Sequence, residues 1–116
     1  MRRALLTFVL ALGAAPVTAQ SLTYEGRDAQ GLHCVAMIMI EVAVLEASGD
    51  LTPDQRQSAL QDGAKILAQL PGTPEQKNRA AMQRAERILE TFSGNALADE
   101  HNRTMRWCER DFLTGS

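Results

Sequence analysis

The sequence predicts an all-α fold, a small up-down-up-down four-helix bundle, and three observations support this prediction. The first is an apolar run at positions 34–47, CVAMIMIEVAVLEA, in which only two residues are polar. The second is a repeated helix-start signature, TPDQ at positions 52–55 and TPEQ at positions 73–76. The third is that the loops between the predicted helices have only about two to four residues, which forces sequential helices to run antiparallel.

We predict that the apolar run is the central helix of this bundle. A surface helix would show a polar stripe with a period of 3.6 residues, and the run has none. Its alanine and methionine content favours a helix over a buried strand, and fourteen residues are too few to span a bilayer, which needs about 20. We expect this first helix to begin near Gly31 and to end at Ser48. The side chains expected to be shielded are Val35, Ile38, Val42 and Leu45.

Residues 1–19 have the three parts of a secretory signal peptide. Arg2 and Arg3 form a positive n-region, an apolar h-region follows, and the small residues at positions 17–19 form a cleavage site. The h-region is too short for a membrane anchor. We therefore expect cleavage before Gln20, export to the periplasm or beyond, and no membrane span in the mature protein.

The mature chain is predicted to be one small domain, a disulfide-stabilised unit of 97 residues. We expect a loose N-terminus over residues 20–31 and a helical bundle domain over residues 32–116. The mature sequence contains ten basic and fourteen acidic residues, a net charge of −4, and the two signs are interspersed on the later helices. This pattern lacks the basic stripe that phosphate backbones require, so we expect no nucleic-acid partner.

Capping signals delimit the later helices. In both signatures threonine is the N-cap, proline is the first helical residue and glutamine completes a capping box. The predicted spans are Pro53 to about Leu70, Pro74 to about Phe92, and a fourth helix capped by Asn95 that reaches about Leu113. Their predicted inward stripes are Ala59, Leu60, Ala64, Ile66, Leu67 and Leu70 in the second helix, Ala81, Ala85, Ile88, Leu89 and Phe92 in the third, and Leu97, Ala98, His101, Met105, Cys108 and Phe112 in the fourth.

The two cysteines, Cys34 and Cys108, are expected to form a disulfide, because export places them in an oxidising compartment. The sequence contains no Cys-x-x-Cys motif that would support redox catalysis or haem attachment. In the predicted topology the first and last helices are antiparallel. A bond from the start of one to the end of the other agrees with that topology.

The same register places Glu41 opposite His101. Opposed residues on antiparallel helices keep a constant sum of residue numbers, and this sum is 142 for both the cysteine pair and the Glu41–His101 pair. A buried carboxylate facing an imidazole has two interpretations. It is either a pH-responsive latch or acid–base pair, or it has no chemical role, as a satisfied interior polar pair or as a glutamate that simply reaches solvent. No nucleophile accompanies the two residues, so we predict a protein that is not an enzyme and assign no catalytic residue.

Histidine and methionine stand four residues apart twice, as His33 with Met37 and as His101 with Met105. Imidazole and thioether ligands suit copper(I). The antiparallel register, however, separates the two histidines by about 10 Å along the helix axis, and methionines usually fill cores. We therefore expect no cofactor and no metal. If a copper-type site is present, His101, Met105 and Met37 are its candidate ligands.

Two classes of function remain. The first is a non-enzymatic protein-interaction module, which binds another protein or a second copy through apolar surface of the first helix that a small bundle leaves uncovered. The second is a small-ligand or copper-type metal binder that uses Glu41, His101, Met37 and Met105. An exposed apolar strip would favour the first class, and a polar cavity beside Glu41 would favour the second. We predict the first.

Overall fold

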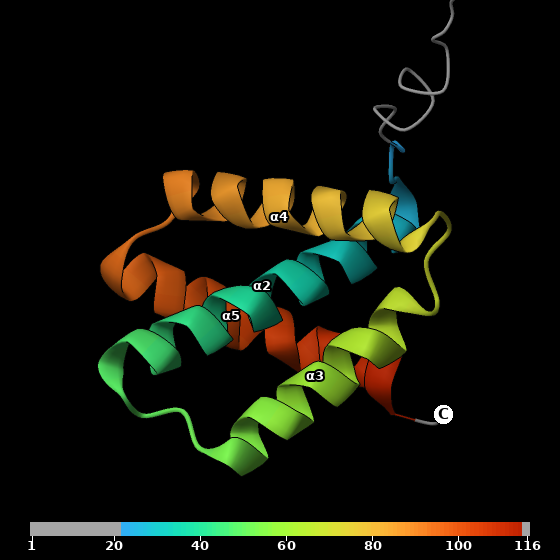
Figure 1. Ribbon diagram of the computed structural model, residues 1–116. Helices are drawn as coiled ribbons and strands as arrows, with labels where there is room; N and C mark the ends of the chain where they lie inside the picture. The colour runs from blue at the N-terminus through green and yellow to red at the C-terminus, as the bar shows by residue number, and fades with distance from the viewer. Residues whose placement is uncertain (1–21, 115–116) are drawn as a thin grey trace, which may run out of the picture.

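The computed structural model describes residues 22–114, and this part of the chain folds into four α-helices and one short π-helix without strands. The elements are α2 (Gly26–Ser48), α3 (Pro53–Leu67), α4 (Pro74–Thr91), α5 (Gly94–Cys108) and the π-helix η3 (Glu109–Leu113). Figure 1 shows α2 running through the middle of the bundle, with α4 on one side and α3 on another. The predicted all-α bundle is confirmed, whereas the predicted signal peptide, residues 1–19, lies outside the described residues.

The central helix is α2, because α3, α4 and α5 each make their main contacts with it. The buried residues of α2 all lie in its N-terminal two thirds and are Gly31, Leu32, Cys34, Val35, Ala36, Met37, Ile38 and Ile40. By length and apolar composition, α2 is also the single helix of the described chain that could cross a membrane, a test that a buried core helix also meets. Its packing against three other helices is what a core helix requires.

The start of α2 differs from the prediction. We expected residues 20–31 to be loose, but the chain is helical from Gly26 onward. Gly31 lies where α2 approaches the end of α3 and the C-terminal turn. A Cβ atom at this position would lie 2.9 Å from Leu70 Cδ2 and 3.0 Å from Phe112 Cε1. Glycine at position 31 therefore allows close packing of the helix and does not mark its boundary.

The helix ends in the middle of the chain follow the capping signals. Thr52 Oγ1 accepts a hydrogen bond from the Gln55 amide at 3.1 Å, and Gln55 Oε1 accepts one from the Thr52 amide at 2.9 Å. Thr73 and Gln76 form the same capping box at the start of α4. The C-terminus of α2 is closed by Gly49 in the left-handed conformation, with φ of 79°. These local signals act within a few residues, which is why the sequence predicts them well.

The last helix differs at both ends. Its N-cap is Ser93 and its first residue is Gly94, so the predicted Asn95 cap is wrong. The α-helix ends at Cys108, and the chain continues to the predicted end as η3, whose wider π-helical turn carries Phe112 into the core. The Arg27 guanidinium lies 4.2 Å from the centroid of the Phe112 ring and covers it from the α2 side.

The inward stripes are confirmed only in part. Residues that were predicted to face inward but are exposed are Leu60, Ala64, Leu89 and Ala98. On α2, Val35 and Ile38 are buried as expected, but Val42 and Leu45 are only half-buried. The physical reason is that continuous burial of α2 stops at Ile40, and beyond it hollows remain between α2 and its neighbours α3 and α5. Apolar side chains near this end therefore remain at the surface.

Candidate functional site

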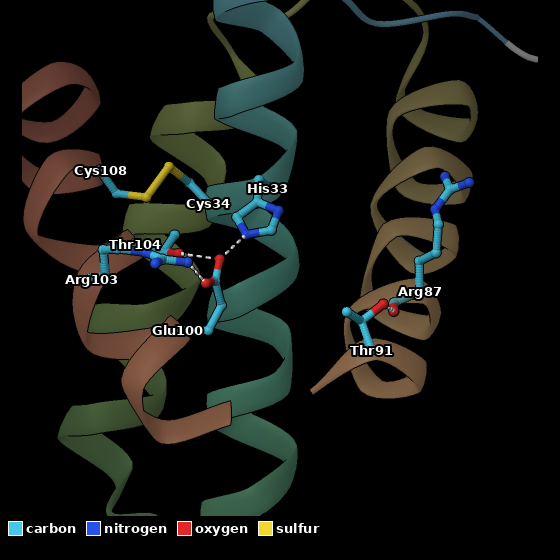
Figure 2. A network of polar contacts seen from close by, with 8 residues as sticks. All are labelled: His33, Cys34, Arg87, Thr91, Glu100, Arg103, Thr104 and Cys108. Carbon is cyan, nitrogen blue, oxygen red and sulfur yellow. Dashed lines mark hydrogen bonds and ion pairs between the residues drawn. A yellow bond between two sulfur atoms is a disulfide. The ribbon is translucent and has the colours of Figure 1, made fainter. Parts of the chain in front are cut away.

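The predicted disulfide joins Cys34 near the start of α2 to Cys108 at the end of α5. The two Cα atoms are 5.8 Å apart, within the normal range for such a bond, and both residues are completely buried. The disulfide thus fixes one end of α5 against the N-terminal half of the central helix. Figure 2 shows it directly beside a network of polar side chains.

Glu41 and His101 are in contact, but they do not form a buried pair. His101 Nε2 lies 3.1 Å from Glu41 Oε1, which links α2 to α5. The Glu41 side chain is 43% exposed and the His101 side chain is 27% exposed. The prediction of burial is wrong because Glu41 lies beyond Ile40, where the covering of α2 ends. Solvent screens such a pair, so it stabilises the fold by no more than about 1 kcal/mol.

The buried polar network lies elsewhere and involves a residue that sequence reasoning missed, Glu100, which is 7% exposed. Its Oε2 atom lies 3.0 Å from His33 Nε2 and accepts a hydrogen bond of 3.2 Å from the Thr104 hydroxyl. The other carboxylate oxygen pairs with Arg103 on the same helix. Figure 2 shows Glu100 of α5 reaching along the helix axis toward His33 of α2. This arrangement satisfies the carboxylate from two helices.

One sequence signal could have identified Glu100. Glu100, Thr104 and Cys108 are spaced by four residues, so the face of α5 that carries the disulfide also carries these two polar side chains. The prediction instead followed the neighbouring apolar stripe through His101. His33 precedes Cys34, and its ring stacks on Trp107 with a centroid distance of 6.4 Å. The histidine is thereby held beside the disulfide.

Burial lowers the pKa of His33, and the positive charges of Arg84 on α4 and Arg103 on α5 lower it further. The neighbouring Glu100 carboxylate favours the protonated ring, but burial and the two arginines outweigh it. Because the carboxylate accepts, the neutral ring donates from Nε2, a tautomer that follows from the hydrogen-bond partners. His33 is therefore a structural hydrogen-bond donor near neutral pH.

The low pKa of His33 makes stability depend on pH. Below about pH 6.5, the ordinary value, the unfolded chain binds a proton that native His33 does not, so the free energy of unfolding should fall as pH decreases from there toward the folded pKa. The variant His33→Gln keeps a hydrogen-bond donor for Glu100 but has no imidazole to titrate. Its free energy of unfolding should therefore lack this fall at acidic pH. Urea unfolding over a pH series measures it. His101→Gln is the matched control, and its free energy of unfolding should still fall as pH decreases. An unchanged pH dependence in His33→Gln would contradict the assignment.

The candidate metal ligands do not converge on one point. Met37 is fully buried and lines the same hollow as Glu41 and His101, whereas Met105 lines a second hollow that Glu41 also borders. His33 is occupied by Glu100. Among residues 22–114 no group of three or more His, Cys, Asp or Glu side chains is placed to hold a metal ion. Three of the four candidate ligands of the alternative function therefore border one hollow, and Met105 borders the other.

Three hollows flank the C-terminal part of α2. One, of about 300 Å³, lies between α2 and α5 beside Glu41 and His101 and has mostly apolar walls. A second, of about 190 Å³, lies between α2 and α3 near Met105. The third is the largest of these, about 540 Å³, and we call it the α2–α3 groove. Its lining is mostly apolar and includes Val35, Met39, Val42, Leu60, Ala64 and Leu67.

Comparisons with protein-family models, curated proteins and solved structures found no significant match to this chain.

Proposed function

We propose that this protein is a small exported, non-enzymatic interaction module whose α2–α3 groove binds an amphipathic helix of a partner protein. The observation that carries the proposal is the exposure of large apolar side chains along this groove. Leu60 is 64% exposed and Met39 is 36% exposed, and both line the groove. Contiguous apolar surface of this kind is typical of protein-binding sites, and a methionine adapts its shape to different partners.

The dimensions of the groove suit a helical segment. Its lining on α2 extends from Val35 to Glu46, a length of about 16 Å, which matches about three turns of a bound helix. On the α3 side, Gly63 and Ala64 present almost no side chain, so a partner helix can approach the backbone closely. This is the helix-in-groove mode, in which apolar residues at i, i+3, i+4 and i+7 are the anchors.

The charge of the protein favours a different protein over a second copy as the occupant. The mature chain has a net charge of −4, and like charges oppose self-association. Glu46 lies at one end of the groove and carries an exposed carboxylate that pairs with Arg56. A partner helix with basic residues on its polar face would complement the net charge of −4. Self-association is one outcome that the experiment below distinguishes.

Export is part of the proposal and rests on two consistent features. The N-terminal sequence has the charge, the apolar segment and the small residues of a signal peptide. The disulfide of the folded domain agrees with an oxidising compartment such as the periplasm. The partner would therefore be sought among exported proteins.

The test uses a photo-crosslinking amino acid at position 60 or position 89 of the protein in its native exported fraction. Position 89 is a matched control, because Leu89 is 52% exposed on α4 and does not line the groove. We expect crosslinks to a discrete partner from position 60 only. With that partner purified, Leu60→Glu should weaken binding at least tenfold, and Leu89→Glu should leave it unchanged. Both substitutions are at exposed positions and should alter stability by only about 0.5 kcal/mol.

Each alternative gives a different result in the same experiment. Equal effects of Leu60→Glu and Leu89→Glu would contradict the groove as the binding site. A crosslinked product of twice the protein's own mass would show self-association. The second candidate function, a small-ligand site, is favoured by the apolar hollow beside Glu41 and His101. Leu60→Glu would leave that ligand bound, because Leu60 does not line this hollow.

A further inference from the structure

A fourth hollow lies away from the groove, where the segment before α2 meets α2 and α4. Its volume is about 550 Å³. Unlike the hollow beside Glu41 and the groove, its lining is more polar than apolar, and it contains two arginines and no carboxylate among the described lining residues. The polar lining residues are Thr23, Tyr24, Gln83, Arg84 and Arg87.

Arg84 and Arg87 are close to each other and lack a counter-charge. They stand three residues apart on α4, so they share one face of the helix. The pKa of Arg84 is lowered, first by burial and then by the charge of Arg87. Neither guanidinium has a hydrogen bond or an ion pair with another residue of the described chain. In Figure 2 the Arg87 side chain extends along α4, away from the Glu100 network.

The Arg84 guanidinium also has a buried donor, its Nε atom. It is buried and has no hydrogen-bond partner. Buried polar atoms in native proteins almost always have a partner, and a charged donor without one is costly. An oxyanion in the hollow would compensate the charge of this guanidinium, because a guanidinium presents parallel N–H groups that match the two oxygens of a carboxylate or phosphate.

The surrounding groups are compatible with an anion. Burial raises the pKa of Tyr24, and the Asp28 carboxylate raises it further, so the phenol stays protonated. Its hydroxyl donates to the Pro71 carbonyl at 2.8 Å and holds this wall of the hollow in place. His33, which feels the charge of Arg84, is neutral near pH 7 for the reasons given above. Asp28 acts on Tyr24 but is not among the lining residues.

We propose that this hollow is a binding site for a small oxyanion, a carboxylate or a phosphate- or sulfate-type group, held by the guanidinium groups of Arg84 and Arg87. The apolar part of an organic anion would lie against Leu22 and Leu32, which also line the hollow. The site is distinct from the α2–α3 groove and shares no lining residue with it.

The test titrates the folded protein with sodium sulfate and, separately, with sodium acetate, at pH 7 and at constant ionic strength kept with chloride. The readout is the Arg84 Nε–H resonance in nitrogen-15 NMR spectra. We expect a saturable shift with at least one of the two anions, and the anion that binds more tightly identifies the ligand class. Arg87→Gln, at an exposed position, should fold normally and raise the dissociation constant about tenfold.

The control is Arg106→Gln, which removes the same charge from an exposed position on α5 outside the hollow. It should leave the dissociation constant within about twofold of the wild-type value. A shift that is linear in anion concentration, or one equally affected by Arg87→Gln and Arg106→Gln, would overturn the proposal. Partner binding in the groove is measured separately through Leu60, so failure of one proposal leaves the other intact.

Discussion

Replacing both cysteines, as Cys34→Ala with Cys108→Ala, is expected to lower the free energy of unfolding by about 4 kcal/mol. The two residues are 74 positions apart in sequence, so the disulfide closes most of the mature chain into one loop. Its loss restores the conformational entropy of that loop to the unfolded state. Because a domain of this size has a total stability of about 5–15 kcal/mol, the variant should be close to the limit of folding. Urea unfolding followed by circular dichroism measures the change.

Reduction supplies the control for this experiment. Adding a reducing agent during unfolding should lower the stability of the wild-type protein by a similar amount and should not affect the double variant. Alanine is chosen because both cysteines are completely buried and a hydroxyl at either position would lack a partner. A change below about 1 kcal/mol would show that the disulfide contributes little to the fold.

The variant Glu100→Ala is expected to lower the free energy of unfolding by about 3 kcal/mol. Removing this carboxylate leaves the His33 ring and the Thr104 hydroxyl, which is fully buried, without their shared acceptor. Each buried group without a partner costs about 1–3 kcal/mol. Arg103 adds little to this sum because its side chain is largely exposed and water can replace the lost contact. Urea unfolding at pH 7 measures the change.

Glu41→Ala is the matched control, because it also removes a glutamate that contacts a histidine across α2 and α5. The Glu41–His101 pair is solvent-exposed, so its loss should cost no more than about 1 kcal/mol. Equal losses of stability from Glu100→Ala and Glu41→Ala would mean that burial does not distinguish the two pairs. The Glu100 network would then not be the structural centre described above.

The sequence predicted the features that local chemistry or helix register determines. The capping boxes at Thr52 and Thr73 depend on residues within one turn, and both are present. The contact between Glu41 and His101 follows from the antiparallel register that the disulfide sets. Hydrophobic periodicity marked α3, α4 and α5, because each must place an apolar stripe against α2.

The features that escaped prediction depend on tertiary packing. Glycine is common at helix boundaries, so the sequence suggested that α2 begins at Gly31. Only the closeness of Gly31 to Leu70 and Phe112 shows that it allows close packing. In the sequence Glu100 resembles a surface residue, and its burial follows only from its contact with His33 of α2. Likewise, periodicity placed Leu60 on an inward face, but it does not show that the neighbouring helices leave a groove there and that Leu60 stays exposed. Burial of a polar residue and exposure of an apolar one are both set by the partner surface.

Because burial of α2 ends at Ile40, the two parts of this helix are held with different strength. Its N-terminal part is clamped by the disulfide, by the Glu100 network and by Arg27 on the Phe112 ring. Its C-terminal part has hollows on several sides, so we expect its local opening to cost less free energy than global unfolding. A partner helix bound in the proposed groove would contact mainly the less buried part of α2. We therefore expect amide hydrogen exchange in α2 to be faster after Ile40 than before it, because the disulfide and the Glu100 network hold the N-terminal part in place.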